Sequence, residues 1–262
     1  MALTRLGAVD YLNARPLVHG LEKRTDLFEL RFDPPSKCAT LLHEGGIDVG
    51  MIPTIEFQRG AGPYCIVGGM GIVSDGPVAS VALFSTRPVP SIRSIAVDTS
   101  SRTSAGLLHV LCRDAFGIAP EFVPMPPAIE SMIERCDAAL VIGDPALYLD
   151  HDAANLEKID LGERWTTMTG LPFVWAFWAG RPGGVTAEGL AALAAARDAG
   201  VAASDAIADA YCGPARAALC RAYLRDNIRY VLDDRAAAGL GKYYELAAKH
   251  GVIDAVRPLE FY

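Results

Sequence analysis

Short apolar runs alternate with longer stretches of helical periodicity along this chain, and that alternation is typical of an α/β protein. Strands are predicted at residues 5–9, 28–32, 47–52, 64–67, 70–73, 78–84, 94–97, 121–123, 138–142 and 173–179. Helices are predicted at residues 16–23, 37–44, 107–115, 128–135, 186–197, 204–211, 214–232 and 243–249. The last third of the chain is therefore almost entirely helical, and we interpret its helices as packing elements.

The order of these elements predicts two lobes. A chain of 262 residues is long enough for two lobes of about 130 residues each. Two prolines within residues 86–90 begin a second lobe, and the strand at 173–179 passes back into the first. We therefore expect a discontinuous first lobe, residues 1–86 plus 178–262, and a second lobe, residues 87–177.

Composition narrows the classes of partner. Hydrophobic residues make up 51% of the chain and charged residues 21%, which suits a sizeable core, and the formal net charge is −7. An acidic chain without a basic face is not expected to bind nucleic acid. The first residues lack the apolar core of a signal peptide, and the longest apolar run, 171–179, is too short to cross a bilayer. We expect a cytoplasmic protein with no nucleic-acid or membrane partner; the sequence leaves its oligomeric state open.

Cofactor and metal motifs are absent from the sequence. It contains no G-x-G-x-x-G, no Walker loop, no H-E-x-x-H and no G-x-S-x-G. The cysteines form no C-x-x-C pair, and we expect all six to be reduced thiols: Cys38, Cys65, Cys112, Cys136, Cys212 and Cys220. The prediction is therefore a protein without cofactor or metal.

A hydroxyl-rich turn at residues 99–104 is the strongest candidate for ligand binding. It contains five Ser or Thr residues and lies between a predicted strand and a predicted helix. The first N–H groups of a helix have no internal partners and lie at the positive end of its dipole. Hydroxyls there either cap the helix in the ordinary way or help to seat a carboxylate or phosphate, and the pattern alone leaves both readings open.

Other polar residues also fall where strands end or line a possible cleft. Asn13 and Asp144 follow predicted strands, the place where ligands of α/β proteins collect, and Ser80 lies on a strand between apolar neighbours. Each has a structural alternative: a turn or cap for Asn13 and Asp144, and a backbone hydrogen bond for Ser80. Glu56 is either a solvated acid of a first helical turn or a site carboxylate. We expect the tryptophans within residues 165–178 to pack in the core rather than to stack on a cofactor.

Taken together, these segments resemble the chorismate dehydratases of the futalosine route to menaquinone. Residues 11–17, YLNARPL, are similar to the F/Y-L-N-x-x-P-L signature of that family. Further segments fit it in the same order along the chain: 46–57, 74–80 (SDGPVAS), 101–104 (SRTS), 142–147 (IGDPAL) and 169–176 (TGLPFVWA). The resemblance spans nearly the whole chain, and the joint order of the segments is more specific than any one of them.

The resemblance implies a type II periplasmic-binding-protein-like fold, with a ligand cleft between two α/β lobes. It implies a cofactor-independent hydro-lyase that removes water from chorismate to give 3-[(1-carboxyvinyl)oxy]benzoate. The site residues it implies are Asn13, Ser80 and Asp144 for catalysis, with Ser101, Thr103, Ser104, Gly143, Thr169 and Gly170 for substrate binding. Arg15 stands where the family motif fixes no residue type, so the resemblance assigns it no role.

The sequence leaves the general base open. Asp144 or Glu56 can serve if burial raises its pKa, and the substrate's own side-chain carboxylate is the third candidate. Two rival functions remain at this point. One is a carboxylate-binding protein of the same fold without chemistry. The other is the sister dihydroxynaphthoate synthase, which uses a cleft histidine where this chain has Gly143-Asp144.

Overall fold

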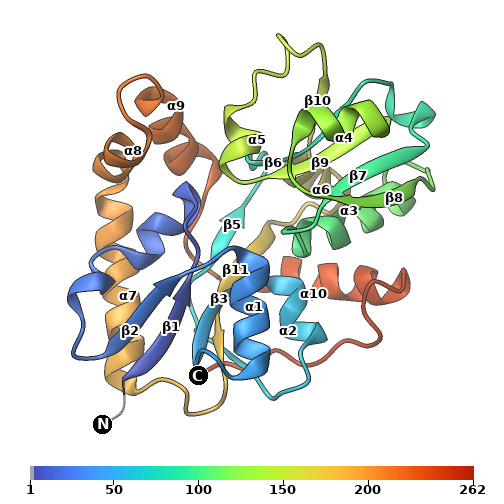
Figure 1. The fold of residues 1–262 in the computed structure, drawn as a ribbon. Coiled ribbons are helices and arrows are strands. Elements are labelled where there is room, and N and C mark those ends of the chain that lie inside the picture. Colours follow the sequence, from blue (N-terminus) through green and yellow to red (C-terminus); the bar gives the residue numbers. More distant parts are fainter. Residues whose placement is uncertain (1–2) are drawn as a thin grey trace.

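The chain builds two sheets, one for each lobe (Figure 1). The structure is a computed structural model that describes residues 3–262. The first sheet has the order β2-β1-β3-β11-β4, with β5 paired to β11. Its strands are β1 (Thr4–Ala8), β2 (Phe28–Phe32), β3 (Val49–Pro53), β4 (Cys65–Ile66), β5 (Ile72–Ser74) and β11 (Phe173–Gly180).

The second sheet has the order β10-β6-β9-β7-β8. Its strands are β6 (Val81–Ser85), β7 (Ser94–Asp98), β8 (Glu121–Met125), β9 (Ala138–Ile142) and β10 (Glu157–Asp160). In both sheets a parallel group is bordered by antiparallel strands: β1 is parallel to β2 and β3, and β7 is parallel to β8 and β9. The carboxyl ends of β1 and β3, and those of β7 and β9, therefore share one edge of their sheets, where ligands of α/β proteins bind.

Helices flank both sheets, and α10 lies against both α3 and β11 (Figure 1). The α-helices are α1 (Pro35–Glu44), α2 (Thr54–Arg59), α3 (Thr103–Asp114), α4 (Ile129–Arg135), α5 (Asp144–Tyr148), α6 (Leu161–Thr169), α7 (Ala187–Ala202), α8 (Ser204–Cys212), α9 (Ala217–Ala222) and α10 (Asp234–Lys249). Short 3₁₀ turns are η1 (Leu12–Val18), η2 (Leu21–Lys23) and η3 (Val89–Ser91), and η4 (Tyr223–Asn227) is a π-turn.

Strands β3, β6 and β9 are buried along their whole length, which explains why their sequences are continuous apolar runs. The three tryptophans are buried: Trp165 and Trp178 are fully enclosed, and Trp175 is 7% exposed. Core packing is therefore the main role of the aromatic segment, as the sequence predicts, although Trp175 also reaches the cleft described below.

The lobe boundaries expected from the sequence do not coincide with the sheets. Strand β6 lies before residue 86, yet it pairs with β9 of the second sheet. Strand β11 lies mostly before residue 178, yet it pairs with β3 of the first sheet. The chain therefore crosses between the sheets before Val81 and before Phe173, because the proline-rich segment after β6 is a turn within the second lobe. Residues 1–2 of the expected first lobe lie outside the described residues.

Three predicted helices differ from the structure. The segment 16–23 forms the two 3₁₀ turns η1 and η2, and Pro16 lies inside the first of them, so its missing N–H favours the tighter turn over an α-helix. The segment 214–232 forms α9 and η4 and then becomes extended, with Arg229 bridged to Val73. Helix α10 begins at Asp234, whose preceding residue Asp233 caps it, rather than at residue 243.

None of the helices formed by residues 3–262 is both long and apolar enough to pass through a lipid bilayer. The same residues form no group of three or more His, Cys, Asp or Glu side chains placed to hold a metal ion.

Candidate functional site

A cleft lies where the two lobes face each other, and its cavity volume is about 70 Å³. Clefts between domains are common places for small ligands to bind. Both lobes contribute to its wall. The first provides Val9, Tyr11, Asn13, Pro35, Met51, Pro53, Ile72, Trp175 and Ala176, and the second provides Val81, Ser100, Ser101, Arg102, Thr103, Ser104, Ile142 and Gly143, with Val78 in the connecting loop.

The wall of this cavity is apolar with a few uncharged polar groups. Its polar groups are the Asn13 carboxamide, the Tyr11 phenol and the hydroxyls of the turn at residues 100–104. Among the described residues, no Asp, Glu, His or Lys side chain lines it, and the single cationic side chain is that of Arg102. Such a wall can bind and orient a ligand through hydrogen bonds, but it offers no ordinary side-chain acid or base.

The hydroxyl turn supplies the best anion seat. The Ser101 side chain is 6% exposed, and its hydroxyl oxygen is buried without a hydrogen-bond partner among the described residues. Helix α3 begins two residues later, and no side chain caps its first N–H groups. A buried polar atom is normally hydrogen-bonded. The free Ser101 hydroxyl and the uncapped helix terminus, with its positive dipole end, together suit a carboxylate.

The neighbouring hydroxyls have other roles. Thr103 Oγ1 accepts a hydrogen bond from the Ile55 N–H at 3.2 Å and lies 3.4 Å from Thr54 Oγ1, so it joins α3 to α2 of the other lobe. Ser100 donates both its N–H and its hydroxyl to Asp98, which fixes the turn. Thr103 and Ser104 both line the cavity, but among the described hydroxyls of this turn only that of Ser101 is buried without a protein partner.

Asn13 lies on the cavity wall, as predicted, while Ser80 lies just behind it. The Ser80 hydroxyl is 2.7 Å from the hydroxyl of Tyr223, and neither residue is among those that line the cavity. The loop around Ser80 is rigidly held, because the Val78 and Ala79 N–H groups donate to Asp160 and the Ser80 carbonyl accepts from Gly143. Direct contact between Ser80 and a ligand therefore stays a prediction.

Gly143 forms part of the wall opposite Tyr11. Its backbone has φ +69° and ψ −151°, a conformation that side-chain-bearing residues rarely adopt. A Cβ atom here would lie 3.1 Å from the Tyr11 ring. Glycine is thus required both for the backbone turn before α5 and for the close approach of the aromatic ring.

Replacing Gly143 by alanine is expected to lower the free energy of unfolding by about 1–3 kcal/mol and to reduce ligand affinity, because the new methyl group displaces Tyr11. Urea unfolding and ligand titration measure the two effects. Gly45→Ala is the matched control, since Gly45 has φ +74° but no atom near its Cβ position. Equal affinity loss in both variants would contradict a role for Gly143 in the cavity wall.

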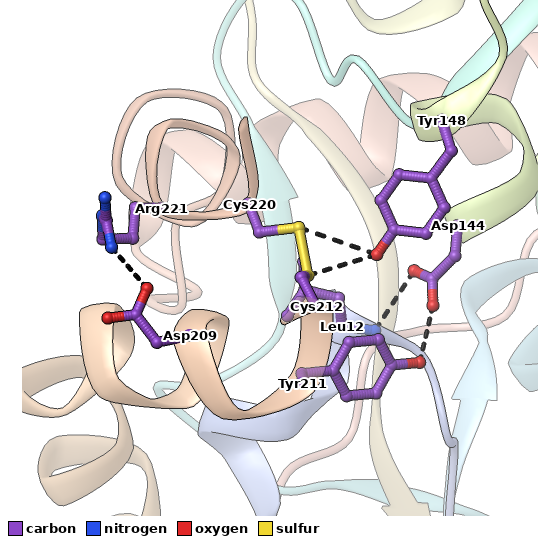
Figure 2. The surroundings of a disulfide bond; sticks show 8 residues. All are labelled: Leu12, Asp144, Tyr148, Asp209, Tyr211, Cys212, Cys220 and Arg221. Atoms are coloured by element: carbon purple, nitrogen blue, oxygen red, sulfur yellow. Dashed lines mark hydrogen bonds and ion pairs between the residues drawn. A yellow bond between two sulfur atoms is a disulfide. The ribbon is translucent and has the colours of Figure 1, made fainter. Parts of the chain in front are cut away.

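Asp144 is not among the residues that line the cavity, so its place among the catalytic groups stays a prediction. Figure 2 shows its carboxylate directed at the first lobe, where it accepts from the Tyr211 hydroxyl at 2.6 Å and from the Leu12 N–H at 3.3 Å. Burial raises the pKa of Asp144, against the hydrogen bonds from Tyr211 and Leu12. Both oxygens are engaged in joining α5 to η1 and α8, so Asp144 positions the segment that carries Asn13.

The raised pKa of Asp144 has a definite consequence for stability. A carboxyl whose folded pKa exceeds its unfolded value, about 3.9, binds protons more readily in the folded state. Its contribution to stability is therefore complete at low pH and is lost as the pH rises through the folded pKa. We expect the free energy of unfolding of wild type minus that of Asp144→Asn to fall as the pH rises from about 4.

Asp48→Asn provides the control for this pH series of urea unfolding measurements. The hydrogen bond from Arg5 holds the pKa of Asp48 below its usual value, so its contribution is lost as the pH falls instead. The two differences should therefore change with pH in opposite directions. If both differences changed with pH in the same direction, burial would not be what destabilises the charged form of Asp144.

The same region contains a disulfide bond that the sequence analysis did not predict. Cys212 at the end of α8 is bonded to Cys220 in α9, because the turn between these helices folds them together (Figure 2). The expectation of six reduced thiols is wrong for this pair, while Cys38, Cys65, Cys112 and Cys136 are free and buried. The Tyr148 hydroxyl lies 3.2 Å from Cys212 Sγ and 3.6 Å from Cys220 Sγ, adding a second contact between α5 and the first lobe.

Glu56 is not a candidate for the general base. It is 2% exposed, forms ion pairs with Arg102 at 2.7 Å and Arg59 at 3.4 Å, and is hydrogen-bonded to His43 at 3.3 Å. Burial alone would raise its pKa, but the hydrogen bond with His43 and the charge of Arg102 hold the pKa below its usual value. A carboxylate so stabilised is a weak base, and it does not line the cavity.

Thr169 and Gly170 are also not among the residues that line the cavity, so their role in substrate binding stays a prediction. The Thr169 hydroxyl donates to the Trp165 carbonyl and accepts from the Leu171 N–H, and Gly170 ends α6 in the left-handed conformation. Both residues shape the turn into β11. Tyr11, Trp175 and Tyr223 were not predicted to belong to the site. For Tyr11 a signal was available, because it is an aromatic residue two positions before Asn13.

Two α/β lobes with a cavity between them define a periplasmic-binding-protein-like fold. The protein AF1704 of Archaeoglobus fulgidus has this fold with a TM-score of 0.78 and 18% identity, over 95% of this chain and 98% of that one. The periplasmic aliphatic sulphonate binding protein SsuA of Escherichia coli has it with a TM-score of 0.67 and 18% identity, over 97% and 94% of the two chains.

The family follows from the sequence comparison. A family model described as menaquinone biosynthesis matches residues 4–249, so the chain belongs to this menaquinone biosynthesis family. A curated relative, the chorismate dehydratase of Thermus thermophilus, is 28% identical over 191 residues, which are 67% of this chain and 69% of the relative.

Proposed function

We propose that this protein is a cytoplasmic chorismate dehydratase, which converts chorismate to 3-[(1-carboxyvinyl)oxy]benzoate and water without a cofactor. Membership of the menaquinone biosynthesis family and the similarity to the Thermus enzyme support this proposal. The observation that carries it is the cavity wall, which combines an apolar surface for a ring with uncharged donors from both lobes and a seat for a carboxylate.

In this proposal the ring carboxylate of chorismate binds at Ser101 and the first N–H groups of α3. Hydrogen bonds to a charged group contribute about 1.5–3 kcal/mol each. That carboxylate is conjugated with the ring carbon from which the proton is removed, so negative charge spreads onto it as the reaction proceeds. Donors already in place at Ser101 and α3 then stabilise the transition state more than the ground state, which is the condition for catalysis.

The substrate's own side-chain carboxylate acts as the base in this proposal. The described wall provides no carboxylate or imidazole of its own, and Asp144 and Glu56 are engaged elsewhere. The carboxylate takes the proton from the ring carbon that bears the ether, and the neighbouring C–O bond breaks. The carboxyl group so formed returns this proton to the departing hydroxyl, which leaves as water. The ring becomes aromatic, and the protein serves mainly to orient the reacting groups through Asn13 and Ser80.

A carboxylate-binding protein without chemistry is the second candidate, because several structural neighbours are binding proteins. The sister dihydroxynaphthoate synthase is less well supported, since no histidine lines the described cavity wall. Incubation of the purified protein with chorismate alone separates these candidates. Appearance of an aromatic ultraviolet spectrum supports the dehydratase, whereas saturable binding with unchanged chorismate would favour the binding protein.

A further inference from the structure

A buried tyrosine links two of the predicted catalytic residues. The hydroxyl groups of Tyr223 and Ser80 are 2.7 Å apart, with the two residues only 2% and 1% exposed. The Asn13 side chain lies close enough to the Tyr223 phenol to lower its pKa. One phenol group therefore connects a residue of the cavity wall in the first lobe with a residue behind the wall in the second.

The chain holds Tyr223 in this place from a distant part of the sequence. Tyr223 is the first residue of the π-turn η4, and single π-turns often occur at functional sites. At the other end of η4, the Asn227 amide donates to the Pro77 carbonyl at 2.9 Å, three residues before Ser80. The π-turn is thus fixed to the Ser80 loop at both of its ends.

We propose that Tyr223 is a positioning residue, whose phenol holds Asn13 and Ser80 in the one orientation that suits the leaving hydroxyl of the substrate. This inference rests on the proposed dehydratase function. A neutral phenol donates one hydrogen bond and accepts others, so two polar partners fix how each of them is turned. Complete burial raises the pKa of Tyr223, which keeps its proton in place for this task.

Tyr230 is a second buried tyrosine of this region and allows a comparison with Tyr223. It is 5% exposed and lies seven residues after Tyr223, yet its hydroxyl has no hydrogen-bond partner among the described residues. The two tyrosines thus differ in whether the hydroxyl has partners. Removal of the hydroxyl from Tyr230 is the matched control for its removal from Tyr223.

The test compares Tyr223→Phe and Tyr230→Phe in steady-state turnover of chorismate. We expect Tyr223→Phe to lower kcat by about 10- to 100-fold with KM changed by less than about threefold, because a misplaced reacting group costs rate rather than affinity. Tyr230→Phe should keep the wild-type values. Unchanged kcat in Tyr223→Phe, or a raised KM at unchanged kcat, would overturn the inference.

A double-mutant cycle separates positioning from a general loss of structure. If Tyr223 acts through Asn13, the Asn13→Ala variant and the Asn13→Ala/Tyr223→Phe double variant should have the same residual kcat. A double variant whose loss of kcat equals the product of the two single losses would overturn the inference. Ser80→Ala removes the same hydrogen bond from its other end and replaces Tyr223→Phe if that variant does not fold. If the wild-type protein leaves chorismate unchanged, the proposed function is refuted. If the wild type is active and Tyr223→Phe is equally active, only the inference about Tyr223 is refuted.

Discussion

Replacing Asn13 by alanine is expected to lower kcat for chorismate by about 10²- to 10³-fold, the usual cost of a lost oriented donor. Asn13 is the only carboxamide on the described cavity wall, and its segment is anchored by the hydrogen bond between Leu12 and Asp144. The carboxamide is proposed to contact the hydroxyl that departs, so its effect should appear in kcat, with KM changed by only a few-fold.

Asn155→Gly provides the control, because it removes a carboxamide from an exposed position that does not line the cleft, where φ is +52° and glycine is tolerated. It should retain most of the wild-type kcat. Steady-state assays that follow the aromatic product measure both variants, and circular dichroism checks that they are folded. An Asn13→Ala chain with wild-type kcat would remove Asn13 from the mechanism.

The second large effect is expected for Ser101→Ala, which should raise KM for chorismate by about 10- to 150-fold, the equivalent of one hydrogen bond to a charged group. It should also lower kcat, because the same donor is proposed to stabilise the transition state more than the ground state. The free energy of unfolding should not fall, because the Ser101 hydroxyl has no hydrogen-bond partner among the described residues and the substitution therefore breaks no hydrogen bond within the protein. A loss of binding without a loss of stability is the signature of a group reserved for a ligand.

Ser85→Ala should behave in the opposite way. Ser85 is equally buried, but its hydroxyl donates to the Arg87 carbonyl at 2.7 Å and accepts from the Arg87 N–H at 3.1 Å. Its loss should destabilise the fold and leave KM unchanged. Urea unfolding combined with chorismate titration tests the pair, and an unchanged KM in Ser101→Ala would contradict the proposed carboxylate seat.

The sequence predicted the elements that rest on a local pattern. The strand and helix on either side of the hydroxyl turn are β7 and α3, because alternating and helical periodicities there are strong and uninterrupted. The helix predicted across residues 214–232 failed because tertiary contacts override its periodicity: the chain leaves the helix at η4 so that Arg229 can pair with Val73. The crossing before β6 was missed because only strand pairing reveals it.

The sequence predicted which residues line the candidate site better than it predicted what each residue does there. Asn13, Ser101, Thr103, Ser104 and Gly143 do meet at one cavity, as strand ends of an α/β fold should. Nothing in the local sequence shows that Asp144 is bonded to Tyr211, or that Thr103 is bonded to Ile55. These roles depend on the other lobe, as does the contact between Ser80 and Tyr223, which are 143 positions apart.

The most direct test is a crystal structure of this protein with the aromatic product 3-[(1-carboxyvinyl)oxy]benzoate. The proposal predicts the product in the cavity between the lobes, its ring carboxylate within hydrogen-bond distance of the Ser101 hydroxyl and the first N–H groups of α3, and its ring beside Asn13. Product bound outside this cavity, or bound in it with the ring carboxylate turned away from α3, would contradict the account.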